Sequence, residues 1–327
     1  MKICFLDSNP NPYSSNDLYS NNVRGAESIL INLANNFKNL GHEVFVFNNI
    51  LNKTNINGVE WNNIKKLNHK NTFDLAITNN DMRLFNNIDS KKKIALSHSV
   101  QNIEKFIRKK QLYAYIKHKP KIVFMGKYHQ STRNFFLKIF GYINVNWPAE
   151  TIFSNYKLIE NIDKYKAIFT SYKDRNLNIL IDIWKNYIFK KNKKLKLYIT
   201  PTNYDLRNFN IFNRKFLSKE IMINEMITSR LFLIPGHKAE LFCFAAEEAR
   251  ELCIPIVTLG IGSLSERVEH NKTGFIAKNY KEFANYSFEL FNNNALWTEF
   301  RNNLINIRGK KNWLQTSAKL LKDIFNE

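Results

Sequence analysis

Short apolar runs alternate along the whole chain with segments in which apolar residues recur every three or four positions. The first pattern is typical of buried strands, and the second is typical of amphipathic helices. Their repeated alternation predicts parallel sheets covered by helices, which is an α/β fold of doubly wound, Rossmann-like domains. The strands predicted in the first half are Lys2–Leu6, Glu43–Asn48, Asp74–Thr78, Lys93–Leu96 and Lys121–Met125.

The clearest predicted helix covers Ala26–Leu40, where the apolar residues form one stripe and Gly41 supplies a stop signal. The preceding segment SNPNPYSSNDLYSNNVRG joins the first strand to this helix over eighteen residues, Ser8 to Gly25. Loops of this length between a strand and a helix are usually functional or mobile. We therefore expect this loop to contribute to a binding site.

The alternation pauses near Trp147–Pro148 and then starts again. The strands predicted in the second half are Lys166–Thr170, Leu195–Thr200, Leu231–Ile234, Pro255–Leu259 and Gly274–Ala277. We expect an N-terminal domain (residues 1–155), a C-terminal domain (156–310) and a final helix (311–327, with its helical pattern at 311–326) that could pack back on the N-terminal domain. Ligands of such domains bind outside the carboxyl ends of the strands, so a central cleft between the two sheets is the expected site.

The composition indicates a globular protein, because 44% of the residues are hydrophobic and 14% are aromatic. The opening MKICFLDSNP does not have the pattern of a signal peptide, and no apolar run approaches the roughly 18 residues of a membrane span. The three cysteines lie in apolar segments without metal-ligand spacing. These features lead us to expect a cytoplasmic protein with reduced cysteines.

The chain has a net charge of +21, and the basic excess of residues 1–150 lies in one stretch. Lys91–Lys138 contains thirteen Lys or Arg and one acid, Glu104, whereas the rest of residues 1–150 has eight bases and nine acids. Such a surface attracts lipid head groups, nucleotides or nucleic acid, although a solvated face is the alternative. The stretch also contains apolar and aromatic residues: Phe106, Ile107, Tyr113, Tyr115, Phe135 and Phe136.

A basic surface with interleaved aromatic residues suits contact with an anionic membrane, which for this protein would be at its inner face. The alternative is that the same aromatic residues belong to the core. Nucleic acid is not the favoured partner, because the sequence has no helix-turn-helix, zinc or RNA-recognition signature.

The main candidates for binding and catalytic residues lie in PGHKAELFCFAAEEARELCIP, residues 235–255, directly after a predicted strand. Glu240 and Glu248 are eight residues apart and flank the start of a predicted helix, whose N-terminus is suited to binding a diphosphate. Two carboxylates beside an anion site match a nucleotide-sugar, which has a hydroxyl-bearing ring at each end of its diphosphate. The alternative is that the carboxylates cap and solvate the helix.

The two other glutamates of this segment, Glu247 and Glu251, are expected to face solvent or to pair with Arg250 or Lys238.

The arrangement P-x4-E-x7-E, formed by Pro235, Glu240 and Glu248, resembles the E-x7-E motif of retaining glycosyltransferases of family 4. Other segments resemble that family in the same order along nearly the whole chain: VRGAESILINLANNFKNLGHEVFVF (Val23–Phe47), FTSYKDRNLNILIDIW (Phe169–Trp184), Pro255-Ile-Val-Thr and GIGSLSERVEHNKTGF (Gly260–Phe275). The resemblance implies the GT-B architecture, with two Rossmann-like domains, and transfer of a sugar from a nucleotide-sugar to a glycan or lipid-linked acceptor.

The resemblance also assigns roles in catalysis. It implies that Glu248 binds the ribose hydroxyls, Glu240 binds a hydroxyl of the transferred sugar, and Arg175 offsets the charge on the leaving diphosphate. His98 occupies the position of a histidine that faces the donor sugar, with a merely structural histidine as the alternative. No metal ion and no cofactor other than the donor substrate are expected.

Further donor contacts are implied at Ser171, at Gly25 in the first loop, and at Gly262 and Ser263 in the GIGSLSE segment. Glu266 in the same segment is expected to orient the loop rather than to touch substrate.

The sequence departs from the family pattern at five positions. The family has glycines where this chain has Arg24, Leu241, Cys243 and Cys253, and an arginine near the place of Phe169. These departures keep two alternatives open, a GT-B protein that binds sugar or a partner without turnover, and a nucleotide-sugar isomerase on the same fold. A nucleic-acid-binding protein is the least favoured alternative.

Overall fold

The computed structural model describes residues 1–20, 23–68, 70, 72–214 and 218–325, and the chain divides into two compact units. Unit 1 contains Met1–Pro148 and Asn312–Glu327, and unit 2 contains Ala149–Lys311. The division after residue 148 lies seven residues before the boundary expected at residue 155. The last helix belongs to unit 1, and Asn326, the last residue of its expected range, lies outside the described residues.

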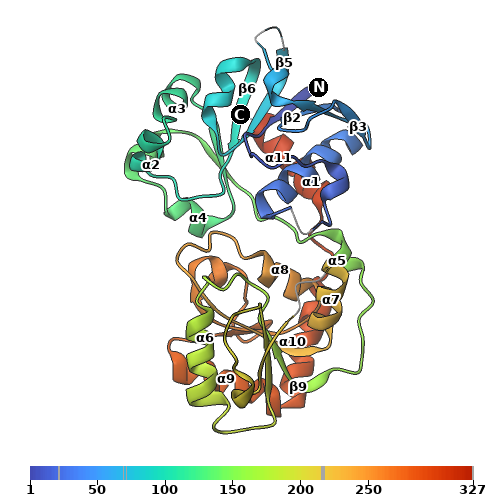
Figure 1. The fold of residues 1–327 in the computed structure, drawn as a ribbon, viewed down its shortest axis with the longest axis vertical. Coiled ribbons are helices and arrows are strands. Elements are labelled where there is room, and N and C mark those ends of the chain that lie inside the picture. Colours follow the sequence, from blue (N-terminus) through green and yellow to red (C-terminus); the bar gives the residue numbers. More distant parts are fainter. Residues whose placement is uncertain (21–22, 69, 71, 215–217, 326–327) are drawn as a thin grey trace. The chain divides into compact units, whose positions relative to one another are not determined.

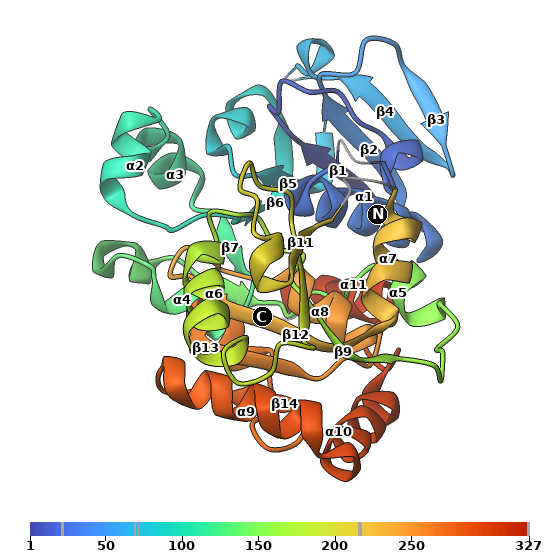
Figure 2. The same ribbon diagram turned by 60° about the horizontal axis from the view of Figure 1, so that its bottom comes forward.

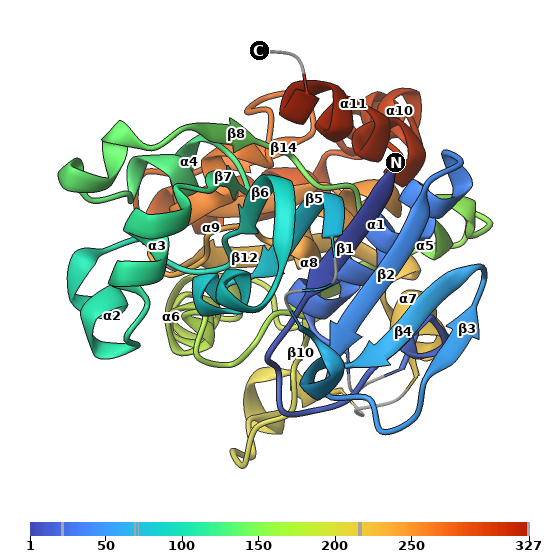
Figure 3. The same ribbon diagram turned by 90° about the horizontal axis from the view of Figure 1, so that it is seen from above.

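Unit 1 is built on an eight-stranded sheet with the strand order β3-β4-β2-β1-β5-β6-β7-β8. All neighbouring strands are parallel except β3 and β4, which form an antiparallel hairpin at one end of the sheet, opposite β8 (Figure 3). The strands are β1 (Lys2–Leu6), β2 (Glu43–Asn48), β3 (Thr54–Ile56), β4 (Val59–Asn63), β5 (Thr72–Asn79), β6 (Asp89–Leu96), β7 (Lys121–Phe124) and β8 (Tyr142–Asn144).

The helices of unit 1 are α1 (Gly25–Asn39), α2 (Ile103–Arg108), α3 (Leu112–His118), α4 (Lys127–Ser131) and α11 (Trp313–Phe325). Helix α11 packs beside α1 although the two are far apart in the sequence (Figure 1). Trp313 of α11 stacks on Trp147 with ring centroids 5.7 Å apart. Burial of these two large rings fixes the end of the chain on unit 1.

Unit 2 has a six-stranded, fully parallel sheet with the order β11-β10-β9-β12-β13-β14. Its strands are β9 (Asp163–Ile168), β10 (Lys196–Ile199), β11 (Ile211–Asn213), β12 (Ser229–Gly236), β13 (Ile256–Ile261) and β14 (Gly274–Ile276). Its helices are α5 (Thr151–Asn155), α6 (Leu177–Ile183, continued by a π-helical turn over Trp184–Ile188), α7 (Lys219–Ile227), α8 (Phe244–Glu251), α9 (Tyr280–Asn292) and α10 (Asn294–Ile307).

The β9–α6–β10 and β12–α8–β13 crossovers run in opposite directions across the sheet of unit 2. Because such crossovers are right-handed, α6 and α8 cover opposite faces. Helix α9 contacts α6, and α10 contacts α8, so both faces of the sheet are covered (Figure 2). This is the doubly wound arrangement predicted from the alternation of the sequence.

The structure places β1 and β2 at their predicted bounds, whereas β3, β4, β8 and β11 were missed. The missed strands are three to five residues long, and β4 reads VEWNN, so they lack the continuous apolar run that marks a buried strand. The central strand β12 is longer than predicted, because its register with the neighbouring strands includes Ser229 and Gly236, which lie outside the apolar run.

The basic stretch of unit 1 contains both core and surface aromatic residues. Phe106 and Tyr115 are buried, with ring centroids 4.9 Å apart, and Phe140 packs edge-on against Tyr115 at 4.5 Å. The expectation of a surface position is therefore wrong for Phe106 and Tyr115. Among the described residues, no helix is both long enough and apolar enough to cross a membrane.

Candidate functional site

The candidate residues of unit 2 follow three neighbouring strands. Ser171 and Arg175 follow β9, Glu240 follows β12, and Gly262 and Ser263 follow β13. Because the carboxyl ends of parallel strands lie at the same edge of a sheet, these residues are gathered at one edge. The candidate residues expected from the sequence therefore lie at the same edge of the sheet of unit 2.

Two glycines allow the loops after β12 and β13 to meet closely. A Cβ atom on Gly236 (φ +93°) would lie 2.4 Å from the Ile261 carbonyl oxygen, and one on Gly262 (φ +75°) would lie 2.3 Å from the His237 carbonyl oxygen. The Ser263 N–H donates a hydrogen bond to the Glu240 carbonyl oxygen at 3.0 Å. The position of Glu240 is thus set by a backbone approach that any side chain at Gly236 or Gly262 would prevent.

Glu240 forms an ion pair with Arg175. The Arg175 Nε and Glu240 Oε2 atoms are 3.5 Å apart, and the two side chains are 27% and 14% exposed. Burial raises the pKa of Glu240 to about 7, with a further increase from Asp174, and the charge of Arg175 opposes this rise. A carboxyl group with a pKa near neutrality can accept a hydrogen bond from a ligand hydroxyl or donate one, depending on its protonation.

Glu248 is partly buried in the second turn of α8. Burial raises its pKa to about 7, and the nearby Glu150 raises it further, against the charges of Lys219 and Arg214. Lys219 and Arg214 already have carboxylate partners, Glu150 at 2.5 Å and Glu225 at 2.6 Å. The two cations that act on Glu248 are thus already paired with other carboxylates. Glu248 itself forms no ion pair with a described residue.

Cys243 lies between the two glutamates in the sequence and is buried. Burial raises the pKa of its thiol, and both Glu240 and Glu248 add to this rise, so both carboxylates lie near the sulfur. The side chains of Cys243 and Leu241 are buried in unit 2. The two residues that replace the family's glycines thus pack into the protein.

The expectation that Glu247 and Glu251 face solvent is wrong, because both are buried. Pairing with Arg250 is correct, at 2.8 Å for each glutamate. Glu247 also pairs with Arg267 at 2.6 Å and with Lys311 at 3.4 Å.

Arg267 holds the α8 segment against the loop after β13. Its guanidinium lies 4.2 Å from the ring of Phe242 and 3.6 Å from Glu266, whose predicted role was to orient this loop. The sequence did not reveal the pair of Arg267 with Glu247, because the two residues are twenty positions apart and meet only when the loop after β13 packs on α8.

The two predicted donor-binding serines, Ser171 and Ser263, differ in the hydrogen bonds of their polar atoms. The Thr200 hydroxyl donates to the Ser171 carbonyl oxygen at 2.7 Å, and the Ser263 hydroxyl is fully buried without a hydrogen-bond partner among the described residues. The described residues also include no group of three or more His, Cys, Asp or Glu that could hold a metal ion.

His98 and Gly25 belong to unit 1. Gly25 is the first residue of α1, and His98 follows β6, where its N–H donates to Asn80 Oδ1 at 2.9 Å. Burial lowers the pKa of His98 to about 3, with contributions from His129 and Lys105, so its ring is neutral at pH 7. Its buried Nε2 atom has no hydrogen-bond partner among the described residues.

The family model "Glycosyl transferases group 1" matches residues 190–310, which include Glu240, Glu248, Gly262 and Ser263. Comparison with the sequences of curated proteins gives no match.

Many solved structures match the chain, including three that cover nearly all of it. Sucrose-phosphate synthase from Thermosynechococcus elongatus has a TM-score of 0.72 at 10% identity and covers 98% of both chains. HepE from Anabaena, in complex with UDP and glucose, has a TM-score of 0.71 at 13% identity over 100% of both chains. WaaG, a glycosyltransferase involved in lipopolysaccharide biosynthesis, has a TM-score of 0.66 at 10% identity and covers 99% of this chain and 100% of its own. These similarities confirm the predicted GT-B fold.

Proposed function

We propose that this protein is a retaining, metal-independent glycosyltransferase. It transfers a sugar from a nucleotide-sugar to a glycan or lipid-linked acceptor in the synthesis of a cell-surface polysaccharide or glycoconjugate. The observation that carries the proposal is the pairing of Glu240 with Arg175 at the sheet edge, with Glu248 on the following helix. The match of residues 190–310 to a glycosyltransferase family supports it.

Each residue has a distinct role in this reaction. Glu248 binds the ribose hydroxyls, Glu240 binds a hydroxyl of the transferred sugar, and the diphosphate lies by Arg175 and the N-terminus of α8. The bond between the anomeric carbon and the diphosphate oxygen breaks, and its electron pair stays on the diphosphate. The acceptor oxygen attacks from the same face, and its proton passes to the departing diphosphate oxygen.

Arg175 stabilises the charge that develops on the leaving group, which is the task a metal ion performs in other transferases. The neutral ring of His98 faces the donor sugar, Gly25 lets the first loop approach it, and Ser171, Gly262 and Ser263 complete the donor contacts. Because HepE was solved with UDP, uridine diphosphate sugars are the first donors to test.

Binding of the donor can be tested by thermal unfolding with a panel of nucleotide-sugars. A ligand at 100 times its Kd adds about 2.7 kcal/mol to the stability of the native state. The stabilisation should occur for one nucleotide class and disappear in Glu248→Gln, but not in the control Glu269→Gln, whose side chain is exposed on the same unit. Donor binding without transfer to any acceptor would favour the non-catalytic or isomerase alternative.

We also propose that unit 1 contacts an anionic membrane, which would place the protein at the inner face of the membrane. Six large apolar side chains on α2, α3 and the turn Phe135–Ile139 are more than half exposed: Ile107, Tyr113, Ile116, Phe135, Phe136 and Ile139. We call these six residues the apolar patch. Lys117 and Lys138 lie 6.0 Å from the ring centroids of Tyr113 and Phe135. Apolar insertion combined with lysines at the rim suits anionic lipid head groups.

A further inference from the structure

Unit 1 contains a cavity of about 570 Å³ at the carboxyl ends of β1 and β5. Asp7 follows β1, and Asn79 is the last residue of β5. The strand order continues from β1 to β2 in one direction and from β5 to β6 in the other, so this cavity lies at the topological switch point of the sheet. Crevices at such points are the usual ligand sites of doubly wound sheets.

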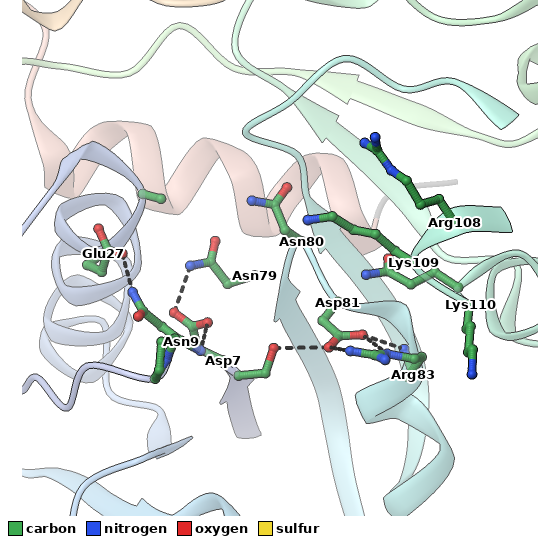
Figure 4. Close-up of a pocket in the computed structure, with 14 residues that line it drawn as sticks. Asp7, Asn9, Glu27, Asn79, Asn80, Asp81, Arg83, Arg108, Lys109 and Lys110 are labelled. Atoms are coloured by element: carbon green, nitrogen blue, oxygen red, sulfur yellow. Dashed lines mark hydrogen bonds and ion pairs between the residues drawn. The ribbon is translucent and has the colours of Figure 1, made fainter. Parts of the chain in front are cut away.

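One wall of the cavity presents carboxylates and amides (Figure 4). Asp7 is buried and accepts hydrogen bonds from the Tyr13 hydroxyl at 2.5 Å, from Asn79 Nδ2 at 2.9 Å and from the Asn9 N–H at 2.9 Å. Asn9 in turn donates to Glu27 at the start of α1. These contacts fix the carboxylates in place, and acidic side chains held in this way are suited to binding sugar hydroxyls.

Asn79 leaves one acceptor unused. Its side chain is 7% exposed, its Nδ2 is engaged by Asp7, and its Oδ1 is buried without a hydrogen-bond partner among the described residues. A buried acceptor without a partner lowers the stability of the protein, and a ligand hydroxyl would supply that partner. Asn79 therefore points to a ligand that donates hydrogen bonds.

The opposite wall is cationic. Arg108, Lys109 and Lys110 at the end of α2 line the cavity across from Asp7 and Glu27 (Figure 4). Their side chains are exposed, and none of the three forms an ion pair with a described residue, whereas Arg83 in the same cavity is neutralised by Asp81 at 2.7 Å. Lys110 has a left-handed backbone with φ +53°, which a lysine rarely adopts. Three cations without ion-pair partners, facing a hydroxyl-binding wall, favour an anionic group on the ligand.

We propose that this cavity binds the acceptor, and that the acceptor is a sugar carrying a phosphate or carboxylate group. Its hydroxyls lie against Asp7 and Asn79, and its anionic group lies against Arg108, Lys109 and Lys110. That the bound sugar is the acceptor rests on the proposed transferase function. Binding of an anionic sugar in the cavity does not depend on a donor.

The test measures binding to the full chain by calorimetry, without any nucleotide-sugar. The ligands are glucose 6-phosphate, mannose 6-phosphate and glucuronate, with glucose, mannose and inorganic phosphate as comparisons. At least one anionic sugar should bind about ten-fold more tightly than its neutral parent and than phosphate alone, and its affinity should fall as salt is added.

Two matched variants locate the binding. Lys110→Gln should weaken binding of the anionic sugar about five-fold or more and leave the neutral sugar unchanged. Lys119→Gln is the control, because Lys119 is also exposed, also left-handed at φ +44°, and does not line the cavity.

Equal loss in both variants, no preference for an anionic sugar over its neutral parent, or phosphate alone binding as tightly as the sugar phosphates would overturn the proposal. Failure of the transferase function would show separately, as absence of nucleotide-sugar binding at Glu248.

Discussion

Arg175 Nε lies 3.5 Å from Glu240 Oε2, although the two residues are sixty-five positions apart in the sequence. They come from the loops after β9 and β12, which are neighbours in the sheet of unit 2. The distance is that of an ion pair rather than a hydrogen bond, and the Arg175 Nε has no hydrogen-bond partner among the described residues. A ligand anion can therefore bind the guanidinium without first breaking a hydrogen bond to Glu240.

Replacing Arg175 should slow the chemical step more than it weakens donor binding. Removing one group that stabilises developing charge typically costs about 10²–10³ in kcat. In Arg175→Ala we expect a loss of this size, and an increase in the pKa of Glu240 above about 7, since Arg175 is the group that lowers it. Steady-state kinetics and the pH dependence of kcat measure both effects. The kcat of Arg175→Lys should lie between those of the wild type and Arg175→Ala, because lysine retains the charge without the planar guanidinium.

Glu248→Gln should make the protein more stable at alkaline pH while abolishing donor binding. The pKa of Glu248 is raised from 4.5 to about 7, so the folded state holds a proton that the unfolded state releases between these values. Glu248 therefore lowers stability as pH rises through this window. We expect Glu248→Gln to gain about 1–3 kcal/mol at pH 8, with the gain shrinking towards pH 4.5. A variant less stable than the wild type at pH 8 in thermal unfolding would contradict this account.

Glu247→Gln should instead make the protein less stable at neutral pH. Burial alone would raise the pKa of Glu247, but the charges of Lys311, Arg250 and Arg267 outweigh burial and lower it below 4.5. Its pairing stabilises the protein above that pH and is lost as pH falls through the lowered pKa.

Breaking such a buried pair costs about 3–5 kcal/mol. Urea unfolding at pH 7 should show a loss of this size for Glu247→Gln. The exposed control Glu269→Gln should stay within about 0.5 kcal/mol of the wild type. Equal effects of the two substitutions would show that the pair of Glu247 with Arg267 contributes nothing.

The apolar patch predicts binding to anionic vesicles. A double substitution Phe135→Ser and Phe136→Ser should reduce cosedimentation with vesicles of equal phosphatidylglycerol and phosphatidylcholine by about ten-fold or more. Tyr204→Ser is the matched control, because Tyr204 is an exposed aromatic residue of unit 2. Binding should weaken as salt is added and should be absent with phosphatidylcholine alone. Equal binding by the wild type and the double variant would refute the patch as a membrane contact.

Much of the fold could be predicted, because strands such as Glu43–Asn48 contain a continuous apolar run, Val44–Phe47, that marks a strand covered on both faces. Short edge strands such as Thr54–Ile56 could not be predicted, since only pairing with a neighbouring strand makes them extended.

The candidate site was predictable where one motif contains it, as for Glu240 and Glu248. Contacts between distant segments were not, because they depend on how the loops pack. The pair of Glu247 with Arg267 and the hydrogen bond from Asn79 to Asp7, seventy-two residues away, are examples. The loop after the first strand was expected to contribute to a binding site, and Ser8, Asn9 and Pro10 of this loop line the cavity of unit 1, but the cationic wall opposite them was not predicted.

The central claim is that Glu240, Glu248 and Arg175 transfer a sugar with retention of configuration. The most direct measurement is proton NMR of the purified protein with an α-linked uridine diphosphate sugar, followed from the first minutes as the donor is hydrolysed. We expect the α-anomer of the free sugar to appear first, with UDP released in equal amount and the rate lost in Glu240→Gln. Initial release of the β-anomer, or an unchanged rate in Glu240→Gln, would contradict the claim.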